Sequence, residues 1–88
     1  MRVVVITKDN TDYARSVVEF MDNFTRQTGR SLETLDPESA EGDTFCRTYD
    51  IVEYPTIVAL SNDGHLQTMW RGATLPTLSE VSYYATQD

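Results

Sequence analysis

A run of β-branched residues near the start of the chain restricts its fold more than any other feature. Residues 2–7 read Arg-Val-Val-Val-Ile-Thr, so a strand formed there would be apolar on both faces. Such a strand is typical of a sheet that is covered on both sides. The run therefore predicts an α/β fold with helices packed against each face of a sheet.

Two helical patterns follow this strand. Apolar residues recur at spacings of three and four between residues 13 and 24, which predicts an amphipathic helix over residues 12–28, ended by Gly29. Residues 38–49 form a poorer helical pattern, because Gly42 lies inside it. The stretch over residues 37–43, which overlaps the start of this pattern, is interpreted as a surface loop.

The remaining segments predict three more strands and a last helix. Residues 31–35 and 56–60 are expected to be strands, and Asp63-Gly64 marks a hairpin turn that leads into a return strand over residues 66–71. Thr77 and Glu80 have the spacing of a capping box, which opens a helix that reaches Ala85. The order β-α-β-α-β-β-α predicts a four-stranded mixed sheet, in which the first two β-α steps give parallel strands.

Length and charge exclude several classes of protein. With 88 residues the chain is expected to be a single domain over residues 1–88. Seven Lys and Arg residues against 14 Asp and Glu give a net charge of -7, which argues against nucleic acid and anionic membranes as partners. The sequence shows no signal peptide or membrane span, so a cytoplasmic protein is expected. One cysteine and one histidine exclude an intrachain disulfide and a Cys-rich zinc site.

The order of elements and one segment of the sequence resemble the thioredoxin-like superfamily in its small, glutaredoxin-sized form. Residues 45–56 carry a Tyr, an aliphatic residue and an aromatic-Pro-Thr triplet at the spacings of that family. The Asn62-Asp63-Gly64 turn and the run Trp70-Arg71-Gly72-Ala73 match its last hairpin and exit. The resemblance covers nearly the whole chain and implies a three-layer α/β/α sandwich. It also implies a cis peptide bond between Tyr54 and Pro55, whereas the residues alone leave an ordinary trans proline open.

The reactive motif of that family is missing. Its members need Cys-x-x-Cys at the start of the first helix, where the helix N-terminus stabilises a thiolate. Thr11-Asp12-Tyr13-Ala14 stands at this position, and a threonine hydroxyl neither ionises there nor exchanges disulfides. Thr11 is interpreted as the N-cap of the helix and Asp12 as a residue of its first turn. No catalytic residue is predicted, so the sequence favours a non-catalytic binding or adaptor domain.

The resemblance also implies a groove between the start of the first helix and the Tyr54-Pro55 turn, which holds glutathione in glutaredoxins. In that family, the lysine that corresponds to Lys8 pairs with a glutathione carboxylate. Asp9 and Asp12 would repel this anionic tripeptide, so we expect an extended peptide or a protein as the partner and no cofactor, although glutathione stays open. The candidate groove residues are Lys8, Thr11, Tyr13, Tyr54, Pro55 and Thr56.

Other candidate residues have simpler interpretations. Cys46 is expected to be a buried, inert core residue, and the alternative is a thiol oxidoreductase or redox sensor that acts through this lone thiol. His65 on the hairpin is interpreted as a solvated side chain. An acidic group formed by Asp36, Glu38, Glu41 and Asp43 lacks the pattern of a calcium loop, so no metal site is predicted. A monomer or a weak homodimer is expected, the latter through the exposed aromatics Tyr83 and Tyr84.

Overall fold

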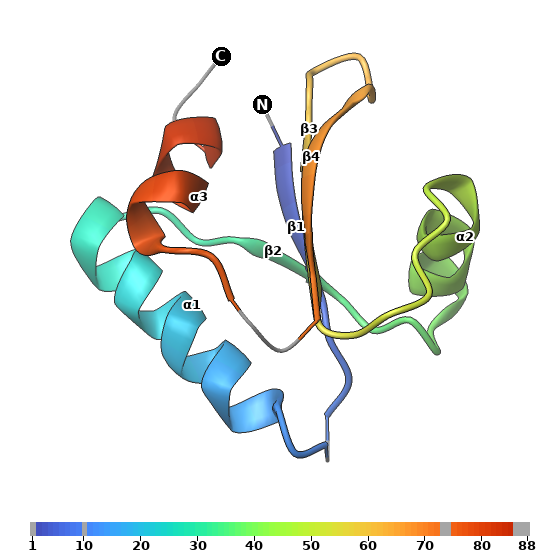
Figure 1. Ribbon diagram of the computed structural model, residues 1–88, viewed down its shortest axis with the longest axis horizontal. Helices are drawn as coiled ribbons and strands as arrows, with labels where there is room; N and C mark the ends of the chain where they lie inside the picture. The colour runs from blue at the N-terminus through green and yellow to red at the C-terminus, as the bar shows by residue number, and fades with distance from the viewer. Residues whose placement is uncertain (1, 10, 73–74, 86–88) are drawn as a thin grey trace.

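The computed structural model describes residues 2–9, 11–72 and 75–85. The elements are β1 (Arg2–Ile6), α1 (Ala14–Thr28), β2 (Glu33–Leu35), α2 (Ala40–Thr48), β3 (Thr56–Leu60), β4 (Leu66–Arg71) and α3 (Leu78–Ala85). The described strands form a four-stranded mixed sheet in the order β2-β1-β3-β4. Figure 1 shows α1 and α3 on one side of this sheet and α2 on the other. The predicted three-layer α/β/α arrangement is therefore confirmed.

The sheet differs from the prediction in the direction of one strand. β1 runs parallel to β2, with Val5 opposite Thr34, but antiparallel to β3, with Ile6 opposite Thr56. The expectation that both β-α steps give parallel strands is therefore wrong for the second step. The chain leaves β2 beside the end of β1 and enters β3 at that same end on the other side of β1, so the connection through α2 does not run back to the opposite end of the sheet.

The apolar run in β1 supplies the core on both faces of the sheet. Alternate residues of β1 and β3 point to opposite sides, as the two-residue period of a strand requires. The α1/α3 face buries Val3, Val5, Val17, Phe24, Ile57, Ala59 and Val81. The α2 face buries Val4, Ile6, Leu35, Cys46, Ile51, Val58 and Leu60. The inference from residues 2–7 that the strand is covered twice is thus confirmed.

The surroundings of Gly42 in helix α2 correct the interpretation of this residue as a weak point. The helix begins at Ala40, and the Ser39 hydroxyl caps it by accepting a hydrogen bond from the Gly42 N–H at 3.0 Å. A Cβ at Gly42 would lie 1.8 Å from the Asp36 carbonyl oxygen. Gly42 therefore permits a close approach of two backbone segments and is no weak point of the helix. The predicted loop over residues 37–43 is wrong, because its second half is helical and Pro37 is buried.

The hairpin between β3 and β4 and the cap of α3 agree with the predictions from the sequence. The hairpin closes with a hydrogen bond from the Gly64 N–H to the Ser61 carbonyl at 2.9 Å. The Thr77 hydroxyl accepts from the Glu80 N–H at 3.1 Å, and the Glu80 carboxylate accepts from the Thr77 N–H at 3.2 Å, which confirms the capping box. Among the described residues, no helix combines the length and apolarity that crossing a membrane requires.

Candidate functional site

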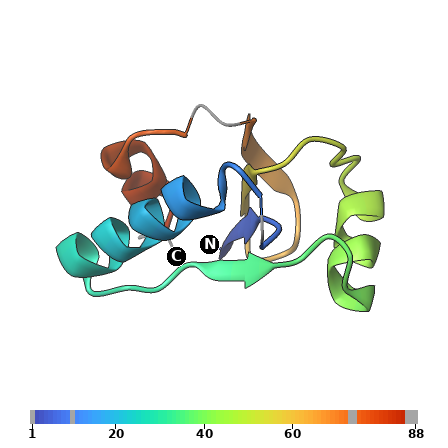
Figure 2. The same ribbon diagram turned by 90° about the horizontal axis from the view of Figure 1, so that it is seen from below.

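The end of the sheet at which β1 stops and β3 starts brings most of the candidate groove residues together. Because Ile6 pairs with Thr56, Lys8 emerges from β1 beside the segment that leads into β3. The Lys8 ammonium lies 5.2 Å from the centre of the Tyr54 ring, within the range of a cation–π contact. Figure 2, seen from this end, shows the β1–α1 loop beside the chain that enters β3.

The positive charge of Lys8 already has a partner. Its ammonium nitrogen lies 3.2 Å from Oε1 of Glu38, a residue of the turn before α2. This contact is the main cause that raises the pKa of Lys8, and the hydroxyls of Tyr54 and Tyr13 add to the shift. An anionic ligand at Lys8 would have to displace or rearrange the Glu38 carboxylate. The sequence did not indicate this ion pair, since the two residues are far apart along the chain.

The start of α1 differs from the prediction. The Thr11 hydroxyl donates to the Lys8 carbonyl at 3.0 Å and makes no cap to the helix. The helix begins at Ala14, with Tyr13 as its N-cap residue and no acidic residue in its first turn. The interpretations of Thr11 as the N-cap and of Asp12 as a first-turn residue are therefore wrong. Because its hydroxyl is engaged by the loop, Thr11 closes the β1–α1 connection.

The backbone around Pro55 is fixed by hydrogen bonds on both sides of the proline. The Tyr54–Pro55 peptide bond is cis, the isomer that the resemblance implies. The hydroxyl of Thr56, which is 1% exposed, donates to the Glu53 carbonyl at 2.6 Å, and the Pro55 carbonyl accepts from the Gly72 N–H at 2.8 Å. Within the described ranges, the N–H and C=O of Tyr54 itself have no such partner. Tyr54 thus offers a backbone donor and acceptor next to Lys8.

The single thiol of the chain lies behind Tyr54. Cys46 on α2 is 7% exposed, and Tyr54 packs against the core cluster to which Cys46 belongs. Burial raises the pKa of the Cys46 thiol, and Asp43 adds to the shift, while the Tyr54 hydroxyl opposes it. A buried thiol that stays protonated is a poor nucleophile. No pattern in the sequence indicates this contact, because it joins α2 to the loop before β3.

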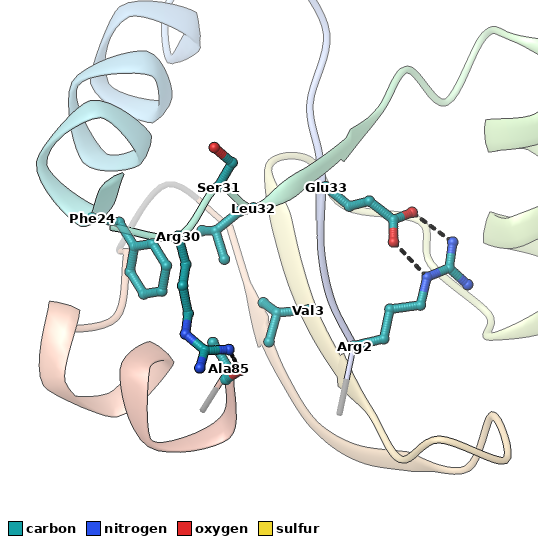
Figure 3. A pocket seen from close by; sticks show the side chains of 8 residues that line it. All are labelled: Arg2, Val3, Phe24, Arg30, Ser31, Leu32, Glu33 and Ala85. Carbon is teal, nitrogen blue, oxygen red and sulfur yellow. Dashed lines mark hydrogen bonds and ion pairs between the residues drawn. The ribbon is translucent and has the colours of Figure 1, made fainter. Parts of the chain in front are cut away.

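A separate hollow lies at the opposite end of the sheet. It has a volume of about 440 Å³ and lies between the ends of α1 and α3 and the start of β2. Figure 3 shows its two guanidinium groups, and both are engaged. Arg2 donates two hydrogen bonds to Glu33, at 2.7 and 2.6 Å, and Arg30 donates to the Ala85 carbonyl at 3.3 Å. These contacts tie β1 to β2 and the loop after α1 to the end of α3, and no candidate groove residue lies here.

The acidic group before and within α2 is divided among separate partners. Glu38 pairs with Lys8, Asp43 lies 3.1 Å from Arg47, and Asp36 accepts a hydrogen bond from the Glu38 N–H. Across the residues that the structure describes, no three His, Cys, Asp or Glu side chains are grouped so that they could hold a metal ion. His65 is exposed on the hairpin, with Nδ1 3.3 Å from Asp63.

Comparisons with known proteins show which fold this geometry shares. No family model and no curated protein matches the sequence. Thioredoxin 1 from the thermophilic eubacterium Thermosipho africanus superposes over 97% of this chain and 90% of its own, with a TM-score of 0.67 and 13% identity. The chain has a thioredoxin-like fold. This result confirms the fold that the sequence resemblance predicted.

Two further solved structures agree on the architecture. A malarial protein covers 94% of this chain and 90% of its own, with a TM-score of 0.66 and 13% identity. A thioredoxin from Thermus thermophilus covers 94% of this chain and 69% of its own, with a TM-score of 0.59 and 15% identity. At such identities the thioredoxin-like fold is shared, whereas chemistry must be argued from the residues of this chain.

Proposed function

We propose that this chain is a non-catalytic thioredoxin-like binding domain. Its partner is an extended segment of another protein, which docks beside Lys8, Thr11 and Tyr54. The observation that carries the proposal is the backbone of Tyr54, whose N–H and C=O have no partner among the described residues although the backbone on either side is fixed. A peptide that runs alongside Tyr54 would pair with both groups in the manner of an added β-strand.

The residues of the proposed groove favour binding over redox catalysis. The start of α1 carries Thr11 and Ala14 in place of thiols, and the Thr11 hydroxyl is engaged by the Lys8 carbonyl. The remaining thiol, Cys46, is buried with a raised pKa, so the alternative function as a thiol oxidoreductase or redox sensor has less support.

Charge favours a cationic partner segment over glutathione. Asp9, Asp12 and Glu53 are exposed around the groove, and the charge of Lys8 is compensated by Glu38. The chain as a whole has a net charge of -7. Like charges would weaken binding of an anionic tripeptide, whereas lysine or arginine side chains of a partner would be attracted.

The proposal can be tested with peptides selected from a random library on the folded protein. In NMR titrations the selected peptides should shift the amides of Lys8, Thr11 and Tyr54. Asp12→Lys should weaken binding about fivefold, because it reverses a charge beside the groove. Asp22→Lys is the matched control, since it makes the same charge change on an exposed position further along α1 and should leave binding unchanged.

Three results would contradict the proposed function. One is a set of selected peptides that shift only residues remote from Tyr54 and respond equally to both charge reversals. Another is disulfide reduction with glutathione above background that Cys46→Ala abolishes, which would establish the thiol alternative. The third is saturable binding of glutathione alone at the Lys8 end, which would assign the groove to that ligand.

A further inference from the structure

A second surface feature, independent of the groove beside Tyr54, lies between β4 and α3. A hollow with a volume of about 420 Å³ is lined there by two strand residues and four residues of the helix. We call it the aromatic hollow, and its lining residues are Thr68, Trp70, Ser79, Glu80, Tyr83 and Tyr84. Three of these six side chains are aromatic and one is a carboxylate. This composition is typical of sites for organic cations.

The three rings are set nearly at right angles to their neighbours. The Trp70 and Tyr84 ring centres lie 5.6 Å apart with planes at 71°. The Tyr83 and Tyr84 centres lie 5.1 Å apart with planes at 89°. Trp70 and Tyr84 are half-buried against the core, whereas Tyr83 is 62% exposed. Edge-to-face contacts of this kind hold the rings in fixed relative orientations, and the negative face of a ring that borders the hollow attracts a cation.

The carboxylate of the hollow is held in place and negatively charged. Glu80 Oε1 accepts from the Thr77 N–H at 3.2 Å and from the Thr77 hydroxyl at 3.0 Å. These bonds lower the pKa of Glu80, and the neighbouring Trp70 side chain lowers it further. The same bonds hold the carboxylate beside the indole, so a cation over the Trp70 ring would also meet this charge.

None of the protein's own cations fills the aromatic hollow. Each of the seven Lys and Arg side chains has its contact with another residue that lies outside it. The pairs are Arg2 with Glu33, Lys8 with Glu38, Arg15 with Glu19, Arg26 with Asn23, Arg30 with the Ala85 carbonyl, Arg47 with Asp43, and Arg71 with Met69. Arg71 is next to Trp70 in sequence but points to the opposite face of β4, as the alternation along a strand requires. A cation in the hollow must therefore come from another molecule.

From these observations we propose that the aromatic hollow binds an alkylammonium group, such as a methylated lysine side chain or a small quaternary ammonium compound. The alkyl groups would pack on the rings of Trp70 and Tyr83, and the positive charge would face their π-systems and the Glu80 carboxylate. Such cations are only weakly hydrated compared with a primary ammonium, so their transfer from water to the rings costs less. This site is separate from the groove beside Tyr54 and does not depend on the function proposed for it.

The single tryptophan of the chain makes the test direct. Trp70 fluorescence and NMR shifts should report saturable, millimolar binding of tetramethylammonium and choline. The neutral analogue of choline, 3,3-dimethylbutanol, has nearly the same shape and should bind at least about tenfold more weakly if charge matters. A peptide with trimethyllysine compared with choline then separates the two sources, because a peptide site prefers the former.

Three variants assign the contributions within the hollow. Tyr83→Ala should weaken tetramethylammonium binding about threefold to tenfold, whereas Tyr83→Phe keeps the ring and should leave it nearly unchanged. Glu80→Gln removes the charge but keeps an acceptor for the capping box, so weaker binding with an intact α3 is expected. Val52→Ala is the control, since Val52 is 82% exposed and belongs to the loop after α2.

Specific outcomes would overturn this proposal. Equal binding of choline and its neutral analogue would show a merely apolar hollow. Binding that Tyr83→Ala leaves intact would place the cation elsewhere. A dimer that depends on Tyr83 and excludes tetramethylammonium would show that a second copy of the chain covers the hollow. Failure at this site leaves the peptide result at Tyr54 unaffected, so the two proposals are tested separately.

Discussion

The two faces of the sheet are covered in different ways, although the same two central strands supply both (Figure 1). On one face lie α1 and α3, with 15 and 8 residues, and the core there includes the large side chain of Phe24. The other face carries α2, with 9 residues, whose buried positions are Gly42 and Cys46. Helix α1 therefore contributes a large buried side chain to its face, whereas the fully buried positions of α2 are small and the large apolar side chains of that face come mainly from the sheet and the loops.

The largest effect is expected on the α1/α3 face. Phe24 is fully buried there, between α1 and the sheet. Phe24→Ala should lower the free energy of unfolding by about 3–5 kcal/mol, because it removes apolar contact and leaves a cavity. Chemical denaturation followed by circular dichroism measures this loss. A loss below about 1 kcal/mol would mean that this face is not stabilised by its large side chains.

A smaller loss of stability is expected on the α2 face, where a substitution would add atoms instead of removing them. In an exposed helix Gly→Ala stabilises by about 1 kcal/mol. At Gly42 the new methyl group would meet the Asp36 carbonyl, so Gly42→Ala should instead destabilise by about 1–3 kcal/mol. Thr44→Ala, at an exposed position of the same helix, is the control and should have little effect. Stabilisation by Gly42→Ala would refute the close backbone approach.

The smallest effect concerns the ion pair at the edge of the sheet. Arg2 binds the Glu33 carboxylate and also lies 5.6 Å from the ring centre of Phe45 on the α2 side. The pairing lowers the pKa of Glu33, so its contribution is present above the ordinary pKa of 4.5 and is lost as the pH falls through the folded-state value. Both side chains are about half exposed, so this contribution is at most about 0.5 kcal/mol.

Unfolding measured over an acidic pH series tests this contribution. Glu33→Gln should slightly reduce the fall in the free energy of unfolding at acidic pH. Near neutral pH, the variant and the original protein should show the same pH dependence. An unchanged acid limb would show that the ion pair contributes nothing to folding.

The sequence predicted the parts of this fold that depend on local patterns. The β-branched run of β1, the Asp63-Gly64 hairpin and the capping box at Thr77 each involve neighbouring residues, so their chemistry can be read directly. The cysteine-free start of α1 is equally plain in the sequence. The local patterns gave the element order, and the resemblance carried mainly by residues 45–56 gave the thioredoxin-like fold.

The features that the sequence did not predict depend on how the backbone folds back on itself, over long and short separations along the chain. The direction of β3 is set by where α2 returns the chain, and no local pattern encodes this. Gly42 was interpreted as weakening the helix, because the Asp36 carbonyl that approaches it is visible only in the fold. The Thr11 hydroxyl bonds the Lys8 carbonyl and does not cap the helix, although its position in the sequence was compatible with either bond.

The burial of Cys46 allows its thiol to report the local opening of the structure around it. A thiol reagent reaches this sulfur only when α2 or the adjoining loop separates from the sheet, so its rate of reaction under native conditions measures how often that separation occurs. With a single cysteine in the sequence, this rate has one source. The opening of the α2 face can thus be timed without introducing any probe.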